Sequence, residues 1–219
     1  ERRGHYGDIL FSMHYFYNEL YLLAFSHDEV VHGKKTILDK MYGAYEDKFA
    51  QCRALFLYML SHPGKKMNFM GNEIGQFREW AQYRPQDFEV LGKFPMHAMF
   101  TRFCRDLNHI YLTHPALYVE EYNSDCFSYV TADKDWDLVY AYTRCAGGEQ
   151  ILAVFNFSDE RYRNYLIRLK GNHTLKELIH SASRIYGGNV LQDNVELPVR
   201  NGQCMMDLEP YSGRLFQVW

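Results

Sequence analysis

The cysteines of this chain are few and follow no recognisable pattern. There are five in 219 residues, an odd number at wide spacing, with no C-x-x-C pair. This argues against a disulfide framework and against a zinc knuckle, and it is typical of a reducing cytoplasm, so we expect a cytoplasmic protein without a metal or other cofactor. The cysteines are Cys52, Cys104, Cys126, Cys145 and Cys204.

Long apolar runs and a strong charge imbalance are also missing. The longest apolar runs, Leu20–Phe25 and Ala54–Leu60, are far shorter than the roughly 20 residues of a membrane helix. A net charge of -3 without a basic stripe gives no reason to expect a nucleic-acid partner. No signal peptide opens the chain, and Glu1 is not an initiator Met, so we expect further sequence upstream.

Aromatic residues, by contrast, are abundant. The chain has 18 Tyr, 15 Phe and 3 Trp, which together make 16% of its residues. Aromatic faces stack on sugar rings while hydroxyl and indole groups donate hydrogen bonds, so this composition suits a saccharide site. The alternative is that most of these rings pack in the core.

The first part of the chain, residues 1–117, alternates helical and strand patterns. Apolar residues recur at helical spacing over residues 10–20, 45–62 and 96–111. Between the helices, Tyr21–Phe25 and Lys66–Met70 are short apolar runs without alternation, as in strands covered on both faces of a parallel sheet. This order indicates βα units around a parallel sheet, which two strands alone cannot close.

The second part, residues 118–219, reads as an antiparallel β-sandwich. Its segments are short and rich in β-branched and aromatic residues, and Gly or Asn turns separate several of them. The strongest hairpin signal is Asn201-Gly202. The expected strands are 126–131, 138–144, 151–157, 165–169, 174–179, 195–199, 204–208 and 215–219.

Two polar loops follow the two apolar strands of the first part. In α/β sheets the working residues sit in such loops, at the carboxyl ends of the strands. The first, Ser26–Lys35, contains two acids, two histidines and two lysines, and the second, Gly71–Trp80, contains an acid, amides, a guanidinium and an indole. Such groups can hydrogen-bond sugar hydroxyls, and Trp80 can lie flat on a pyranose ring. The alternative for each loop is an ordinary solvated segment.

The first loop also has a superficial likeness to the zinc helix H-E-x-x-H. That motif needs histidines at positions i and i+4 of a helix, with Glu directly after the first. Here His27 and His32 are five apart, Glu29 is one place late, and the context is a strand followed by a loop. We therefore expect no metal site.

The segment Phe25–Lys34 closely resembles the late catalytic-region motif of the 1,4-α-glucan branching enzymes, members of the α-amylase superfamily of retaining enzymes. His27-Asp28 alone indicates only the superfamily, and the extension Glu29–Lys34 favours branching enzymes. His62–Lys66 and Phe69–Trp80 resemble the next segment of that family. The resemblance implies that residues 1–117 are the last two βα units of a (β/α)₈ barrel and that residues 118–219 are the family's C-terminal β-sandwich.

The resemblance also implies roles. Retaining enzymes use a nucleophile and an acid/base roughly 5 Å apart. By motif position Asp28 is a third catalytic carboxylate, which binds sugar hydroxyls more tightly as the ring distorts, and His27 donates a hydrogen bond to the same sugar. The residues expected to bind the α-glucan substrate are Glu29, Lys34, Glu73, Gln76 and Trp80.

The sequence departs from the family in one respect. The motif of the nucleophile and the strand of the acid Glu are both absent, and both normally precede His27-Asp28. We therefore expect the chain to be a C-terminal part of a longer enzyme that forms α-1,6 branches in glycogen or a similar polymer. The rest of that enzyme is its expected partner, and the chain alone should be inactive.

Two other functions stay open at this point. One is another superfamily hydrolase, either debranching or trehalose-releasing. The other is a non-catalytic glucan-binding module, with Val139–Tyr142 and Tyr118–Tyr122 as candidate stacking segments, although alternating rings in strands more often belong to the core. We also expect residues 1–117 to be the less stable part, because two barrel strands leave edges and apolar faces uncovered.

Overall fold

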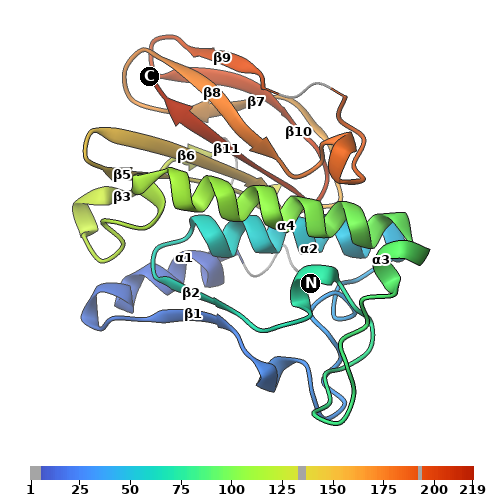
Figure 1. Ribbon diagram of the computed structural model, residues 1–219. Helices are drawn as coiled ribbons and strands as arrows, with labels where there is room; N and C mark the ends of the chain where they lie inside the picture. The colour runs from blue at the N-terminus through green and yellow to red at the C-terminus, as the bar shows by residue number, and fades with distance from the viewer. Residues whose placement is uncertain (1–5, 133–136, 192–193) are drawn as a thin grey trace.

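The computed structural model describes residues 6–132, 137–191 and 194–219, which form layers. At one side lies a pair of parallel strands, β1 (Leu22–Phe25) and β2 (Lys65–Asn68). Two long helices, α2 (Tyr45–Ser61) and α4 (Pro95–Thr113), separate this pair from a β-sandwich that contains the rest of the strands (Figure 1).

The β1–α2–β2 unit has the predicted strand–helix–strand order. β1 and β2 pair in parallel, with Phe25 opposite Asn68. The expectation that both faces of these strands are covered is wrong for this chain, because alternate residues are exposed, with Leu22 at 53%. One face packs on the core through Leu23 and Phe25, and no described element covers the other face.

The helices α2 and α4 begin and end close to where the sequence indicates, whereas the helix expected over residues 10–20 ends early and continues as a 3₁₀ turn. The amide of Ala44 donates to the carboxylate of Asp47 at the start of α2, and Pro63-Gly64 follows its end, with Gly64 at φ 106°. Pro95 occupies the first turn of α4, where the missing N–H costs nothing. The other helical elements among the described residues are α1 (Tyr6–Tyr15), α3 (Val90–Lys93) and the 3₁₀ turns η2 (Phe16–Asn18), η3 (His27–Glu29), η4 (Asn72–Ile74), η5 (Pro115–Leu117), η6 (Ser124–Cys126) and η8 (Arg184–Tyr186).

The predicted antiparallel sandwich is confirmed. Its larger sheet has the order β3-β5-β6-β11-β8-β9, and its smaller sheet has the order β10-β7-β4. All pairings within both sheets are antiparallel. The strands are β3 (Phe127–Tyr129), β4 (Thr131–Ala132), β5 (Val139–Ala146), β6 (Glu149–Asn156), β7 (Tyr162–Arg168), β8 (His173–His180), β9 (Glu196–Val199), β10 (Gln203–Leu208) and β11 (Ser212–Val218).

The hairpin predicted at Asn201-Gly202 forms as a turn but not as a pair of strands. Both residues have positive φ, 51° and 77°, as a tight two-residue turn requires. Only Arg200 and Gln203 then bridge across it. Beyond them β9 joins β8 in the larger sheet and β10 joins β7 in the smaller one, so the turn connects the two sheets.

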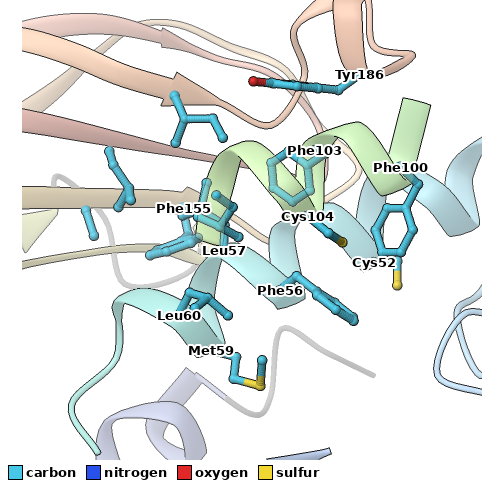
Figure 2. Close-up of a cluster of buried hydrophobic side chains, with 14 of the residues drawn as sticks. Cys52, Phe56, Leu57, Met59, Leu60, Phe100, Phe103, Cys104, Phe155 and Tyr186 are labelled. Atoms are coloured by element: carbon cyan, nitrogen blue, oxygen red, sulfur yellow. The ribbon is translucent and has the colours of Figure 1, made fainter. Parts of the chain in front are cut away.

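Two hydrophobic clusters build the core. One lies between the two sheets of the sandwich. The other joins α2 and α4 to the larger sheet, and in Figure 2 Leu57 and Phe103 from the helices lie near Phe155 and Tyr186 from the sandwich side. Since this second cluster includes residues on both sides of position 117, the boundary proposed there stays a prediction.

The cysteines depart from the sequence expectation at one pair. Cys126 and Cys145 form a disulfide, with Cα atoms 4.7 Å apart, while Cys52, Cys104 and Cys204 are buried thiols. The reason is the strand register, in which Phe127 pairs with Arg144. Cys126, which precedes Phe127, therefore lies opposite Cys145, which follows Arg144. Spacing along the sequence carried no sign of that register. Within the described ranges, no helix is long and apolar enough to cross a membrane.

Candidate functional site

His27 and Asp28 lie directly beyond the carboxyl end of β1. The hydroxyl of Ser26 accepts a hydrogen bond from the amide of Asp28 at 3.2 Å, which caps the short turn η3. The Nε2 atom of His27 lies 3.2 Å from Oδ1 of Asp28, and the two side chains are 55% and 68% exposed. A hydrogen-bond donor and a carboxylate thus face solvent side by side.

The second strand brings its own loop to the same edge. The amide of Phe69, just after β2, donates to the carbonyl of Phe25 at the end of β1. The Phe69 ring then lies 5.8 Å from the ring of His27 and 5.4 Å from that of Trp80. The two polar loops predicted from the sequence therefore meet at the carboxyl ends of the strands.

The other predicted residues of the first loop hold that loop together. Lys34 donates from Nζ to the backbone carbonyl of Asp28 at 2.7 Å. The carboxylate of Glu29 lies 2.9 Å from Nζ of Lys40, and this hydrogen bond and charge lower the pKa of Glu29. The side chains of Glu29 and Lys34 are both exposed to solvent, so these contacts bury neither residue.

Glu79 is the residue to which sequence reasoning gave no role. Its two carboxylate oxygens accept hydrogen bonds from the amides of Gly33 and Lys35, at 3.0 and 2.6 Å, and these bonds lower the pKa of Glu79. His32, Gly33 and Lys35 all have positive φ, which is unfavourable for the two that carry side chains. Glu79 thus fixes the first loop from the second, and its place beside Trp80 in the polar segment was the only available signal.

The predicted residues of the second loop differ in burial and in the groups that they contact. The carboxylate of Glu73 accepts from the amide of Gly71 at 2.9 Å. Gln76 is only 5% exposed, and its side-chain carbonyl accepts from the amide of Asp87 at 3.2 Å. Trp80 is half-buried, packs on the core beside Phe69, and its amide donates to the carbonyl of Val30. The most open pair of the site is therefore His27 and Asp28.

Such a pair has a defined chemical capacity. An imidazole N–H donates and a carboxylate accepts, so together they can bind neighbouring hydroxyls of one sugar. Among the residues that the structure describes, no group of three or more His, Cys, Asp or Glu side chains is placed to hold a metal ion. The geometry thus offers hydroxyl binding.

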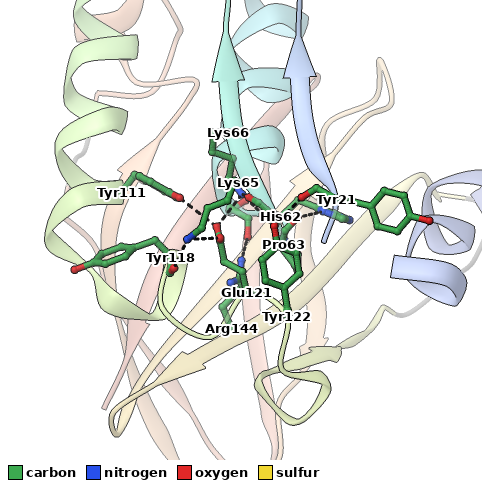
Figure 3. Close-up of polar contacts among 12 residues, drawn as sticks. Tyr21, His62, Pro63, Lys65, Lys66, Tyr111, Tyr118, Glu121, Tyr122 and Arg144 are labelled. Atoms are coloured by element: carbon green, nitrogen blue, oxygen red, sulfur yellow. Dashed lines mark hydrogen bonds and ion pairs between the residues drawn. The ribbon is translucent and has the colours of Figure 1, made fainter. Parts of the chain in front are cut away.

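A buried polar cluster supports the opposite, amino ends of the same strands (Figure 3). The carboxylate of Glu121, almost wholly buried, lies 2.9 Å from Nζ of Lys65 and 3.5 Å from Nζ of Lys66, and it accepts from the hydroxyl of Tyr111 at 3.1 Å. Burial lowers the pKa of Lys66 to about 7, although Glu121 opposes this shift. Arg144 of β5 donates to the carbonyl of Ser61 at the end of α2.

Of the tyrosines that were candidates for sugar stacking, Tyr140 and Tyr142 are core residues, whereas Tyr118 and Tyr122 are only partly buried. Tyr140 and Tyr142 are both buried, and the hydroxyl of Tyr142 lies 2.7 Å from that of Ser61. Tyr122 stacks on Phe16 and donates to the backbone carbonyl of Tyr21. These rings therefore serve packing, which was the alternative stated for them.

Two solved structures resemble this fold. A debranching enzyme from Nostoc punctiforme superposes with a TM-score of 0.53 and 18% identity over 89% of this chain and 32% of that one. AmyP in complex with maltotriose superposes with a TM-score of 0.55 and 12% identity over 78% of this chain and 35% of that one. At these identities the likeness concerns the fold alone.

Sequence relatives are more similar. The 1,4-alpha-glucan branching enzyme of Clostridium perfringens strain SM101 is 36% identical over 205 residues, which are 93% of this chain and 30% of the relative. That of Bradyrhizobium sp. strain BTAi1 is 41% identical over 191 residues, 86% of this chain and 26% of the relative. The chain thus spans less than a third of the length of these relatives.

A domain family matches the sandwich. Residues 129–218 match the family described as the alpha amylase C-terminal all-beta domain. This range begins in β3 and ends in β11, so it covers nearly all strands of both sheets. Together, these comparisons show that the chain is similar to 1,4-alpha-glucan branching enzymes over most of its length and that its sandwich is similar to the alpha amylase C-terminal all-beta domain.

Proposed function

We propose that this chain is the C-terminal part of an enzyme that transfers an α-1,4-linked glucan segment to a 6-hydroxyl and so forms α-1,6 branches in an α-glucan such as glycogen. The observation that carries the proposal is the exposed His27-Asp28 pair at the carboxyl end of a parallel strand, in a chain similar to branching enzymes over most of its length. A cytoplasmic location belongs to the same proposal.

In this proposal Asp28 binds hydroxyls of the sugar next to the cleaved bond, and His27 donates to the same sugar. Both contacts strengthen as the ring flattens toward the oxocarbenium-like transition state, so they accelerate the reaction without taking part in bond making. Lys34 and Glu79 hold the loop that carries the pair. Glu29, Glu73 and Trp80 are the next residues that an extended glucan chain would meet, and Gln76 supports the second loop from within.

The nucleophile and the acid/base belong, in this proposal, to the N-terminal part of the same enzyme. The uncovered face of β1 and β2 supports it, because Leu22 and Met67 expose apolar surface where further strands and helices of a (β/α)₈ barrel would pack. The chain alone would then lack both groups that break and form the glycosidic bond, and it would be inactive.

The decisive experiment uses the full-length parent enzyme and an iodine-stain assay for branching. Replacing Asp28 by Asn should lower kcat by about 10²- to 10³-fold with little change in folding, as for the loss of one oriented group in a preorganised site. Asp159→Asn, at an exposed loop of the sandwich, is the matched control and should leave kcat unchanged. Equal activity of Asp28→Asn and Asp159→Asn would contradict the proposed site.

Product analysis separates the remaining enzyme functions. New α-1,6 branch points without net release of sugar support the branching activity, whereas released linear chains or trehalose would indicate a superfamily hydrolase. The 219-residue chain is tested in the same assay. Turnover by this chain alone would disprove the assignment of the nucleophile and the acid/base to another part of the enzyme.

A further inference from the structure

The disulfide joins two strands at the edge of the larger sheet. Cys126 ends the turn η6, directly before β3, and Cys145 lies near the end of β5. Both cysteines are partly exposed to solvent, while Cys52, Cys104 and Cys204 are buried. Within the described residues, the bridged pair is thus the one that small thiols and disulfides in solution can reach.

This bond adds to a short ladder of hydrogen bonds at the sheet edge. β3 has a single neighbour in its sheet, β5, and only three of its residues pair with it. An edge strand this short gains little from its ladder of hydrogen bonds. The covalent link between Cys126 and Cys145 therefore adds to the ring contacts of Phe127 and the ion pairs of Glu121 in keeping β3 and the residues before it in place.

The residues before β3 form a strap, which we define as residues 118–126, and it reaches the amino ends of both parallel strands (Figure 3). The hydroxyl of Tyr122 donates to the carbonyl of Tyr21 at 2.8 Å, immediately before β1. The carbonyl of Tyr118 accepts from Nζ of Lys65, and the carboxylate of Glu121 lies 2.9 Å from the same atom, at the start of β2. The strap thus connects the sandwich edge to the two strands whose other ends carry the polar loops.

We propose that Cys126 and Cys145 form a redox-sensitive clasp, whose oxidation orders the strap and whose reduction loosens it at the amino ends of β1 and β2. Intracellular disulfides outside hyperthermophiles are mostly transient or sensing ones, and a partly exposed pair at a sheet edge fits that class. The clasp is independent of which reaction the parent enzyme catalyses.

The oxidant that we name is a low-molecular-weight disulfide such as oxidised glutathione. The thiolate of one cysteine attacks a sulfur of that disulfide, which forms a mixed disulfide and expels one thiolate of glutathione. The thiolate of the second cysteine then attacks the protein sulfur of the mixed disulfide and expels the second glutathione thiolate. The two protein thiols lose two electrons and two protons in total, and one glutathione disulfide becomes two thiols.

Hydrogen exchange measured by mass spectrometry on the 219-residue chain tests the clasp. The chain is equilibrated with oxidised glutathione or with dithiothreitol, and peptides of the strap are compared with peptides of the β5–β6 hairpin. We expect exchange in the strap to become at least about tenfold faster on reduction, as for a segment that changes from protected to locally open. The hairpin should change much less, and Tm should fall by about 5 to 10 °C on reduction.

Three variants make the test specific. Cys126→Ser/Cys145→Ser should behave as the reduced chain in both buffers, and Cys126→Ala/Cys145→Ala replaces it if the hydroxyls prevent folding. Cys204→Ala removes a buried thiol elsewhere and should keep the full redox response. The proposal is overturned if the chain keeps all five thiols after oxidised glutathione, or if the bridged and reduced chains show the same exchange in the strap.

Discussion

The β1–β2 pair and the sandwich differ in how the faces of their strands are covered. In the sandwich, alternate residues of β10 are buried and the rest exposed, and the inner faces of two sheets enclose a cluster of their own. In β1 and β2 one face packs on α2 and the opposite face exposes apolar side chains, Leu22 among them. The sandwich therefore completes its own core, whereas the strands that carry the candidate site depend on packing from elsewhere.

Core truncation gives the largest expected contrast between the two regions. Phe216→Ala removes a fully buried ring from the cluster between the two sheets, so we expect the free energy of unfolding to fall by about 3 to 5 kcal/mol. Leu22→Ala removes a side chain that is already half exposed, and its cost should be several times smaller. Urea unfolding of both variants measures this. Similar losses would show that β1 is as well packed as the sandwich.

The next largest effect on the free energy of unfolding is expected from removing the charge of Glu121 in the buried polar cluster. Glu121→Gln leaves Lys66 buried without its carboxylate, which costs about 3 kcal/mol when a buried pair loses one partner. Because Glu121 raises the pKa of Lys66 against the effect of burial, that pKa should also fall further. Glu196→Gln on the exposed face of β9 is the control. Urea midpoints of the two variants that coincide would refute the stabilising role of Glu121.

Acid should weaken both regions through one buried histidine in each. Burial lowers the pKa of His62, after α2, from 6.5 to about 4, and that of His180, in β8, from 6.5 to about 3. Each folded pKa lies below the unfolded value, so the stability contributed by each neutral ring is present above pH 6.5 and is lost as pH falls toward the folded pKa. Between pH 7 and 4.5 the expected loss is about 2 to 3 kcal/mol per histidine.

Urea unfolding at several pH values tests this in the wild type and in variants. His62→Gln and His180→Gln should each flatten the decline of stability with acid, and His109→Gln, at an exposed position of α4, should leave it unchanged. An unchanged slope in both buried variants would mean that other groups cause the acid sensitivity.

The smallest expected effect concerns the loop of the candidate site. Glu79→Ala removes the acceptor of the Gly33 and Lys35 amides without touching the core, so global stability should stay unchanged while exchange of these two amides becomes faster. Glu89→Ala, which breaks an exposed pair with Lys93, is the control and should leave both amides as they are. If the amides of Gly33 and Lys35 stay protected in Glu79→Ala, the first loop keeps its conformation without Glu79.

Much of the fold could be predicted because the governing patterns are local. The apolar stripe of α2 and its Pro63-Gly64 end gave its bounds to within a residue, and the short β-rich segments became the strands of the sandwich. What failed needs long-range information. The separation of β9 and β10 into two sheets, and the register that brings Cys126 to Cys145, depend on partners distant in the sequence.

The candidate site likewise has residues whose position local patterns predict and residues whose role depends on distant partners. The position of His27-Asp28 beyond a strand followed from an apolar run that stops at a polar segment. The role of Glu79 did not follow, because its partners are backbone amides that lie 44 and 46 residues away and have no side-chain signature. In the sequence Gln76 looked like the other polar residues of its loop, and only the packing of Gly71 and Asp87 around it shows it to be buried.

The turn at Asn201-Gly202 has a consequence for the order of folding. Since β9 and β10 pair with β8 and β7 and not with each other, this turn closes no local ladder and cannot nucleate one. The Gly147-Gly148 turn does, because β5 and β6 pair along their whole length on either side of it. Local pairings form before distant ones, so we expect the rate-limiting barrier to include the β5–β6 hairpin and the sheet-connecting turn to settle late.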